Sequence, residues 1–191
     1  IPTVTQPFLS SLISGIEITA KKSGYNVIIM QSHDSYDEEV SLAKSLYSSR
    51  VSGVISSLAM ETRDTSHFQQ FVSNNIPLVF VDRVPKDFNT FRVIIDNYAA
   101  GYKATKHLIE QGCIRIAHLT AGSEFGNLYS ERKRGYIDAL KDHNLPLIEE
   151  LIVNLKTVTY EEGAKESNKL FDLELRPDGI FASGDIIAVS A

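Results

Sequence analysis

The sequence predicts an α/β protein with two doubly wound lobes, each built on a parallel sheet, with the second lobe incomplete within the chain. The first observation is a strict alternation of short apolar runs with amphipathic helical segments, joined by connections of a few residues. The second is that the apolar runs are continuous, as in strands that are buried on both faces. The third is the composition, because 43% hydrophobic and 23% charged residues over 191 positions are typical of a globular protein.

Residues 91–122 carry the clearest pattern. A strand is predicted over the apolar run 93–95, and a helix follows, with Asn97 as its N-cap and Gly112 as the left-handed residue after its end. The next strand is predicted over residues 114–119. A helix between two apolar runs is a βαβ unit, which builds a parallel sheet. We expect this unit to open the second lobe.

The same alternation precedes this unit. Ser35 begins a capping box, S-x-x-E, which marks the start of a helix, and Gly24 ends the helix before it. In chain order we predict the tail of a strand that lacks its first residues (1–4), a helix ending at 24, a strand (25–30), a helix from 35, a strand (51–58), a helix (62–75) and a strand (77–81).

The alternation also continues after residue 122, where Thr159 begins a second capping box. The predicted elements are a helix (130–143), a weak strand (151–155), a helix (160–173), a strand (179–183) and the beginning of a helix at 186. We expect an N-terminal lobe of residues 1–83, a link of residues 84–90, and a C-terminal lobe of residues 91–191 whose sheet needs more chain beyond Ala191.

Several kinds of chemistry find no support in the sequence. The formal net charge of −5 gives no electrostatic reason for this segment to bind nucleic acid or an anionic membrane. There is neither G-x-G-x-x-G nor a P-loop nor a G-x-S-x-G elbow, so no dinucleotide cofactor or serine nucleophile is predicted. The five histidines form no ligand cluster, and Cys113 is the single cysteine, so we expect no zinc site and no internal disulfide.

The densest acidic group is formed by His33-Asp34 with Asp37, Glu38 and Glu39. We interpret it as a solvated helix N-terminus, where carboxylates interact favourably with the helix dipole. The alternative is a site for a divalent cation.

Polar and aromatic residues gather where the predicted strands end. In an open α/β sheet, ligands bind outside the carboxyl ends of the strands. Carboxylates accept hydrogen bonds from hydroxyl groups, arginine donates in a planar fork, and an aromatic ring stacks on a sugar or base. We therefore predict a site for a polar, hydroxyl-rich small molecule, against the alternative that these are ordinary loop residues. The candidates are Phe8 and Leu9 at the first helix, Asp82 and Arg83, Asn127 and Arg132, and Asp185.

Short motifs in order along the chain resemble the effector-binding domain of lac-repressor-type (LacI/GalR) bacterial transcription regulators, which have the type I periplasmic-binding-protein fold. The matching pieces are Gln6-Pro7-Phe8 with Gly15-Ile16-Glu17, Gly24-Tyr25, Arg50-Val51-Ser52-Gly53-Val54-Ile55, Ile76-Pro77-Leu78-Val79 with Asp82-Arg83, Asp96-Asn97 with Gly101, His107-Leu108 and Gly112, Arg132 with Gly135-Tyr136 and Ala139-Leu140, Arg176-Pro177, and Phe181-Ala182-Ser183-Gly184-Asp185.

The resemblance implies roles at matched positions. Phe8 and Leu9 would contact the effector from the first lobe, where Asp82 and Arg83 would also line the cleft. In the second lobe Arg132 would clamp the effector, and Asp185 would accept hydrogen bonds from it. Val158 stands where many members place an aromatic wall, and Gly184 replaces the usual asparagine, so this chain departs from the family pattern at both positions.

The resemblance also implies partners. We expect a cytoplasmic regulator that binds a sugar-like effector between its lobes, forms a homodimer, and contacts operator DNA through a headpiece that is absent from this chain. Two alternatives stay open: a periplasmic sugar-binding protein of a transport system, and a small α/β enzyme working in the same cleft. A helix-turn-helix or a signal peptide directly upstream would separate the first two, and turnover that depends on Asp82 and Asp185 would favour the third.

Overall fold

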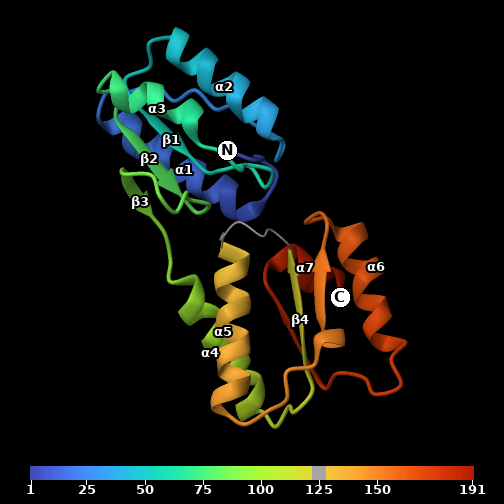
Figure 1. Cartoon of the computed structure of the whole chain (residues 1–191). Coiled ribbons are helices and arrows are strands. Elements are labelled where there is room, and N and C mark those ends of the chain that lie inside the picture. Colours follow the sequence, from blue (N-terminus) through green and yellow to red (C-terminus); the bar gives the residue numbers. More distant parts are fainter. Residues whose placement is uncertain (122–127) are drawn as a thin grey trace. The chain divides into compact units, whose positions relative to one another are not determined.

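The computed structural model describes residues 1–121 and 128–191, which form two compact units, Ile1–Ile94 and Ile95–Ala191 (Figure 1). Each unit contains a three-stranded parallel sheet with helices packed against it. The predicted α/β class with parallel sheets is therefore confirmed. Within the described residues, no helix combines the length and the apolar character needed to cross a membrane.

In the first unit the strand order is β1-β2-β3, with Val54 opposite Leu78 and Val79 opposite Phe91. Ser35 caps α2 by accepting a hydrogen bond from the Glu38 amide at 3.5 Å, as its capping box predicts. The elements are α1 (Pro7–Lys22), α2 (Tyr36–Ser48), β1 (Val54–Ser56), α3 (Ser66–Ser73), β2 (Leu78–Val81) and β3 (Phe91–Val93).

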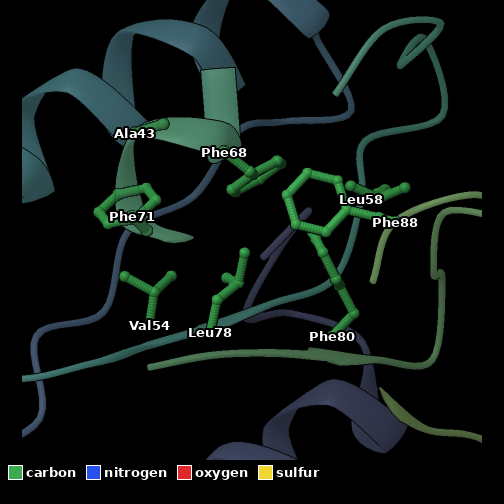
Figure 2. Packing of buried hydrophobic residues seen from close by; sticks show 8 residues of the cluster. All are labelled: Ala43, Val54, Leu58, Phe68, Phe71, Leu78, Phe80 and Phe88. Atoms are coloured by element: carbon green, nitrogen blue, oxygen red, sulfur yellow. The ribbon is translucent and has the colours of Figure 1, made fainter. Parts of the chain in front are cut away.

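The core of this unit lies between the sheet and the pair α2 and α3. Figure 2 shows the aromatic rings of α3 directed at side chains of the two strands below them. Phe80 of β2 contacts Phe68 edge-on at 5.0 Å between ring centroids, a favoured aromatic geometry. The buried cluster comprises Ala43, Val54, Leu58, Phe68, Phe71, Leu78, Phe80 and Phe88.

The strand predicted over residues 25–30 is wrong. No segment of the described chain pairs with residues 25–29 as a strand, and Ile28 is 59% exposed. The two ends of the run have backbone contacts, since the Tyr25 amide donates to the Ala20 carbonyl at 2.9 Å and the Ile1 amine donates to the Met30 carbonyl at 3.1 Å. A strand requires a neighbour for its backbone groups, and an apolar sequence alone does not supply one.

The strand at Phe91 also differs from the prediction. β3 pairs with β2, so it is the third strand of the first sheet and does not open the second. Its side chains are exposed, Phe91 to 80%, whereas the continuous apolar run predicted burial on both faces. β3 lies at the edge of the sheet order, where only one neighbour covers it.

In the second unit the strand order is β5-β4-β6, with Leu119 opposite both Val153 and Ala182. Thr159 caps α6 by accepting from the Glu162 amide at 3.3 Å, as predicted. The elements are α4 (Asn97–Glu110), β4 (Ile116–Ala121), α5 (Leu128–Asp142), the 3-10 turn η1 (Glu149–Leu151), β5 (Ile152–Leu155), α6 (Tyr160–Phe171), β6 (Gly179–Ala182) and α7 (Asp185–Ser190).

The central strand β4 is buried along its whole length, and its alternating side chains enter two different cores. Ile116 packs with Tyr136 and Leu140 of α5 on one face. Ala117 and Leu119 pack on the other face with residues of α6 and α7. The second unit is therefore a three-layer sandwich, as expected for strands buried on both faces.

His118, on the α5 face of β4, is fully buried between the rings of Tyr136 and Phe181. Its Nδ1 lies 3.0 Å from the Phe181 carbonyl, and its Nε2 has no hydrogen-bond partner among the described residues. Burial lowers the pKa of His118 from 6.5 to about 4 because the charged ring loses its hydration.

We therefore expect acid to destabilise the second unit. Between pH 6.5 and 4 the unfolded chain binds a proton at His118 that the folded chain does not, so stability is full above pH 6.5 and falls as the pH approaches 4. The loss attributable to this residue approaches about 3 kcal/mol. Urea unfolding between pH 4.5 and 7.5 should show a smaller pH dependence for His118→Phe than for the wild type, and equal slopes would contradict this.

Candidate functional site

In the first unit, Asp82 and Asp34 stand in unusual backbone conformations. Asp82 directly follows β2 and has a φ of +60°, and its amide donates to the Val93 carbonyl at 3.2 Å. Asp34 has a φ of +64°. Left-handed residues other than glycine are costly and gather at functional sites. Asp82 thus lies at the carboxyl end of a strand, where the sequence placed it.

Arg83 is directed into the protein. It is 5% exposed, and its Nη1 forms an ion pair with Asp34 and also lies 3.5 Å from the Leu58 carbonyl. Arg83 therefore holds Asp34 and the segment just after β1 together, which is a structural role next to the candidate site. Within residues 1–121 and 128–191, its Nε has no hydrogen-bond partner.

The two candidates at the start of α1 differ in exposure. Phe8 is 59% exposed, so its ring is available to a ligand. Leu9 is 2% exposed and is the buried residue of α1. Pro7 begins this helix, as its fixed φ favours. Of the pair, only Phe8 presents a side chain to solvent.

In the second unit, Arg132 is held by two neutral acceptors. Its Nε donates to the Asn97 side-chain oxygen at 3.0 Å, and its Nη1 donates to the Ser183 carbonyl. Asn97 begins α4, and Ser183 directly follows β6. The guanidinium is thereby placed at the carboxyl end of β6, the side of the sheet at which ligands are expected.

Two further candidates of this unit, Val158 and Asp185, lie near the ends of β5 and β6. Asp185 is exposed at the first position of α7, after Gly184 as N-cap. Val158 is half-buried and packs against the core on the α6 side. It provides an apolar contact, without the broad stacking surface of an aromatic ring. Asn127 lies outside the described residues.

Glu39 is a buried polar centre that the sequence analysis missed. Its carboxylate accepts from the Ala59 amide at 2.7 Å and the Thr62 hydroxyl at 2.8 Å, and lies 3.0 Å from Nε2 of His67. The expectation of a fully solvated acidic helix start is therefore wrong for this residue, which is 6% exposed. The described residues contain no group of three or more metal-ligating side chains.

Asn97 is a second residue whose contacts were not predicted. The N-cap of α4 is Asp96, whose carboxylate accepts from the Ala99 amide at 2.8 Å, so the prediction of Asn97 as the cap is wrong by one residue. The signal available in the sequence was the Asp-Asn doublet itself. Both residue types cap well, only one can do so, and the other is left free for a different contact.

A groove of about 530 Å³ lies along β6 in the same unit. Its lining is apolar apart from His107, and includes Ala104 of α4, Phe181 of β6 and Ala188 of α7. A hydroxyl-rich ligand needs several hydrogen-bonding groups. We therefore place the candidate site at the strand ends and not in this groove.

Comparison with known proteins decides the family. Residues 1–191 match the family described as periplasmic binding proteins and sugar binding domain of LacI family. The chain belongs to this family. The match spans the entire sequence, so both compact units lie within one LacI-family domain.

Two proteins similar to this chain are named as transcriptional repressors. This LacI-family domain is 30% identical over 191 residues to the HTH-type transcriptional repressor PurR of Actinobacillus pleuropneumoniae, and 29% identical to the repressor CytR of Escherichia coli. Those alignments cover 100% of this chain but 56% and 55% of the two repressors, so the chain spans about half the length of these relatives.

Solved structures agree with the fold. The transcription regulator CcpA of Lactococcus lactis superposes with a TM-score of 0.87 at 25% identity, covering 100% of this chain and 68% of that one. A LacI family transcriptional regulator from Lactobacillus casei with bound glucose gives a TM-score of 0.83 at 26% identity, covering 100% and 70%. The solved structures therefore confirm the predicted fold, which is that of LacI-family regulators.

Proposed function

We propose that this chain is the effector-sensing part of a LacI-type transcription regulator. The observation that carries the proposal is the family match over all 191 residues, together with relatives that are HTH-type repressors of nearly twice its length. In this proposal a small metabolite binds between the two lobes and changes how a DNA-binding headpiece contacts its operator, an allosteric coupling of two sites. The protein then works in the cytoplasm as a homodimer and without a catalytic step.

The proposed effector is a neutral, sugar-like molecule. A related regulator from Lactobacillus casei has been solved with glucose and with sucrose. In this chain, Arg132 would donate to oxygen atoms of the effector, Asp82 and Asp185 would accept from its hydroxyl groups, and Phe8 would stack on its apolar face. Leu9, Arg83 and Val158 would support these residues through packing and hydrogen bonds. The assignment of Asn127 stays a prediction.

The test is a thermal-shift screen of the protein with D-glucose, D-ribose, sucrose and adenosine. A ligand that binds only the folded state raises the unfolding temperature by mass action. We expect at least one of these probes to give a concentration-dependent shift. The absence of any shift across the panel and a wider set of sugars and nucleosides would count against a sensor.

Arg132 gives the sharpest mutational prediction for this function. Arg132→Ala removes charge-assisted hydrogen bonds of about 1.5–3 kcal/mol, so we expect the affinity for the responding probe to fall by roughly 10- to 100-fold. The matched control is Arg134→Ala on the same helix, since Arg134 is an exposed partner of Glu131. Isothermal titration calorimetry measures both, and equal affinities of the two variants would contradict the role of Arg132.

The alternative is a periplasmic sugar-binding protein, since the family description includes that class. The complete reading frame separates the two. A helix-turn-helix before Ile1 supports the regulator, and a signal peptide in its place supports the transport protein.

A further inference from the structure

We propose that Asn97 is a positioning residue, which holds the Arg132 guanidinium in the orientation that the effector meets. This inference rests on the function proposed above. It adds a residue that touches Arg132 and not the effector, and that lies just after the boundary between the two compact units.

The guanidinium of Arg132 is fixed by two hydrogen bonds. Nε donates to the Asn97 oxygen at 3.0 Å and Nη1 donates to the Ser183 carbonyl. Two bonds from different nitrogens fix both the direction and the plane of this rigid group. Because one acceptor lies in α4 and the other at the end of β6, two different elements hold Arg132.

Asn97 is itself held in place. Its Nδ2 donates to the Ile95 carbonyl at 3.4 Å, which leaves the side-chain oxygen facing Arg132. Its backbone is fixed as well, because the carboxylate of Asp96 caps α4 immediately before it. A side chain held in this way places its acceptor without a further loss of rotamer freedom.

The positive charge of Arg132 has only neutral partners among the described residues. Within the described chain, no carboxylate lies within ion-pair distance of Arg132, and its Nη2 has no hydrogen bond to the described residues. Arg83, whose role is structural, differs in that its charge is paired with the carboxylate of Asp34. Neutral acceptors orient Arg132 and leave its charge for a ligand.

The experiment compares Asn97→Ala and Asn97→Asp with the wild type. The alanine removes the acceptor and the aspartate retains it, because either carboxylate oxygen can accept from Nε. A second variant, Asn97→Ser, also removes the contact, because the serine side chain is too short to reach Arg132. Serine is a favoured residue at the start of a helix. Dispersed amide spectra confirm that each variant is folded.

The first readout needs no ligand. In ¹⁵N NMR spectra, the Nε–H of Arg132, assigned by its loss in Arg132→Lys, should exchange slowly with water in the wild type and in Asn97→Asp. It should exchange at least about tenfold faster in Asn97→Ala, because a hydrogen bond protects its proton. Equal exchange in wild type and alanine variant would overturn the proposal.

The second readout is affinity for whichever of D-glucose, D-ribose, sucrose and adenosine the wild type binds. Asn97→Ala should bind about tenfold more weakly than the wild type, because the arginine must be ordered on binding. Asn97→Asp should bind more tightly than the alanine variant. Unchanged affinity in Asn97→Ala would show that Asn97 has only a structural role.

The two proposals fail in different ways. If the wild type binds none of the probes, the proposed function is contradicted for them, whereas Nε exchange still decides whether Asn97 holds Arg132. If the wild type binds and Asn97→Ala is indistinguishable from it in both readouts, the function stands and the role of Asn97 is rejected.

Discussion

Gly135→Ala should destabilise the second unit by about 3 kcal/mol or more, at the upper end of what overpacking costs. A Cβ built at this position would lie 2.3 Å from the Tyr98 carbonyl and 2.6 Å from the Tyr102 amide. Both are backbone atoms of α4, so no side-chain rotation relieves the contact and the two helices must move apart. Urea unfolding followed by circular dichroism, with hydrogen exchange of α4 and α5 amides, measures the effect in this unit.

Gly15→Ala is the matched control. Gly15 lies within α1, and a Cβ there would meet no atom within 4 Å. The same substitution should therefore stabilise its helix by roughly 0.5–1 kcal/mol, the difference in helix propensity. If both variants lose equal stability, the close approach of α4 and α5 is not the cause.

The same helix contact connects stability to the candidate site. On α4, a Cβ at Gly101 would lie 2.2 Å from the Arg132 carbonyl. The hydroxyls of Tyr98 and Tyr102 donate to Asp138 and Asp142 on α5, each at 3.0 Å, along the same pair of helices. The spacing of α4 and α5 thus determines where Arg132 sits relative to Asn97, and a substitution that separates them should weaken effector binding as well as folding.

Local signals were predicted from the sequence correctly. Ser35 and Thr159 cap their helices because a cap depends on residues only three positions apart. Gly112 has a φ of +92° after α4, as its position after the helix predicts. Asp82 directly follows β2 as expected, and the guanidinium of Arg132 in α5 reaches Ser183 after β6, because a parallel sheet places the carboxyl ends of its strands on one side.

Pairings between distant segments were not predictable in the same way. Residues 25–30 have a strand sequence, but no described segment pairs with them as a strand, and β3 joined the first sheet although its apolar run suited the second equally well. The partners of Arg132 are 35 and 51 residues away. No periodicity or spacing in the sequence indicates contacts of that range, which arise only when the helices pack.

Glu39 in the first unit is another residue whose contacts with distant segments the sequence did not predict. Its sequence neighbours Asp37 and Glu38 suggested a solvated acidic start of α2. In the structure, the segment after β1 and the start of α3 cover Glu39, and polar groups of both form hydrogen bonds with its carboxylate. A carboxylate that satisfies buried donors from three directions is a structural centre, and acidity along the sequence does not reveal it.

Glu39→Ala should therefore destabilise the first unit by about 3–5 kcal/mol, since it leaves buried donors unpaired and removes one member of a buried pair with His67. Glu39→Gln retains an acceptor and should lose roughly 1–2 kcal/mol, because its amide can satisfy some of these donors but not all. Glu38→Ala is the control, because Glu38 is the exposed neighbour on the same helix turn, and it should change stability by less than about 1 kcal/mol.

Hydrogen exchange distinguishes this explanation from a general weakening of α2. The amide of Ala59 donates directly to Glu39, so it should lose protection first in Glu39→Ala, before the amides of β2. Uniform loss of protection through the unit would mean that Glu39 supports α2 alone. Loss confined to residues 59–62 would mean that Glu39 holds the segment after β1, which lies at the carboxyl end of a strand in the first lobe, next to the ion pair of Arg83 with Asp34. In that case Glu39→Ala should also weaken effector binding. The Met60 amide of that segment donates to Asp34 at 3.0 Å, and Asp34 pairs with Arg83, which in our proposal supports the effector-binding residues.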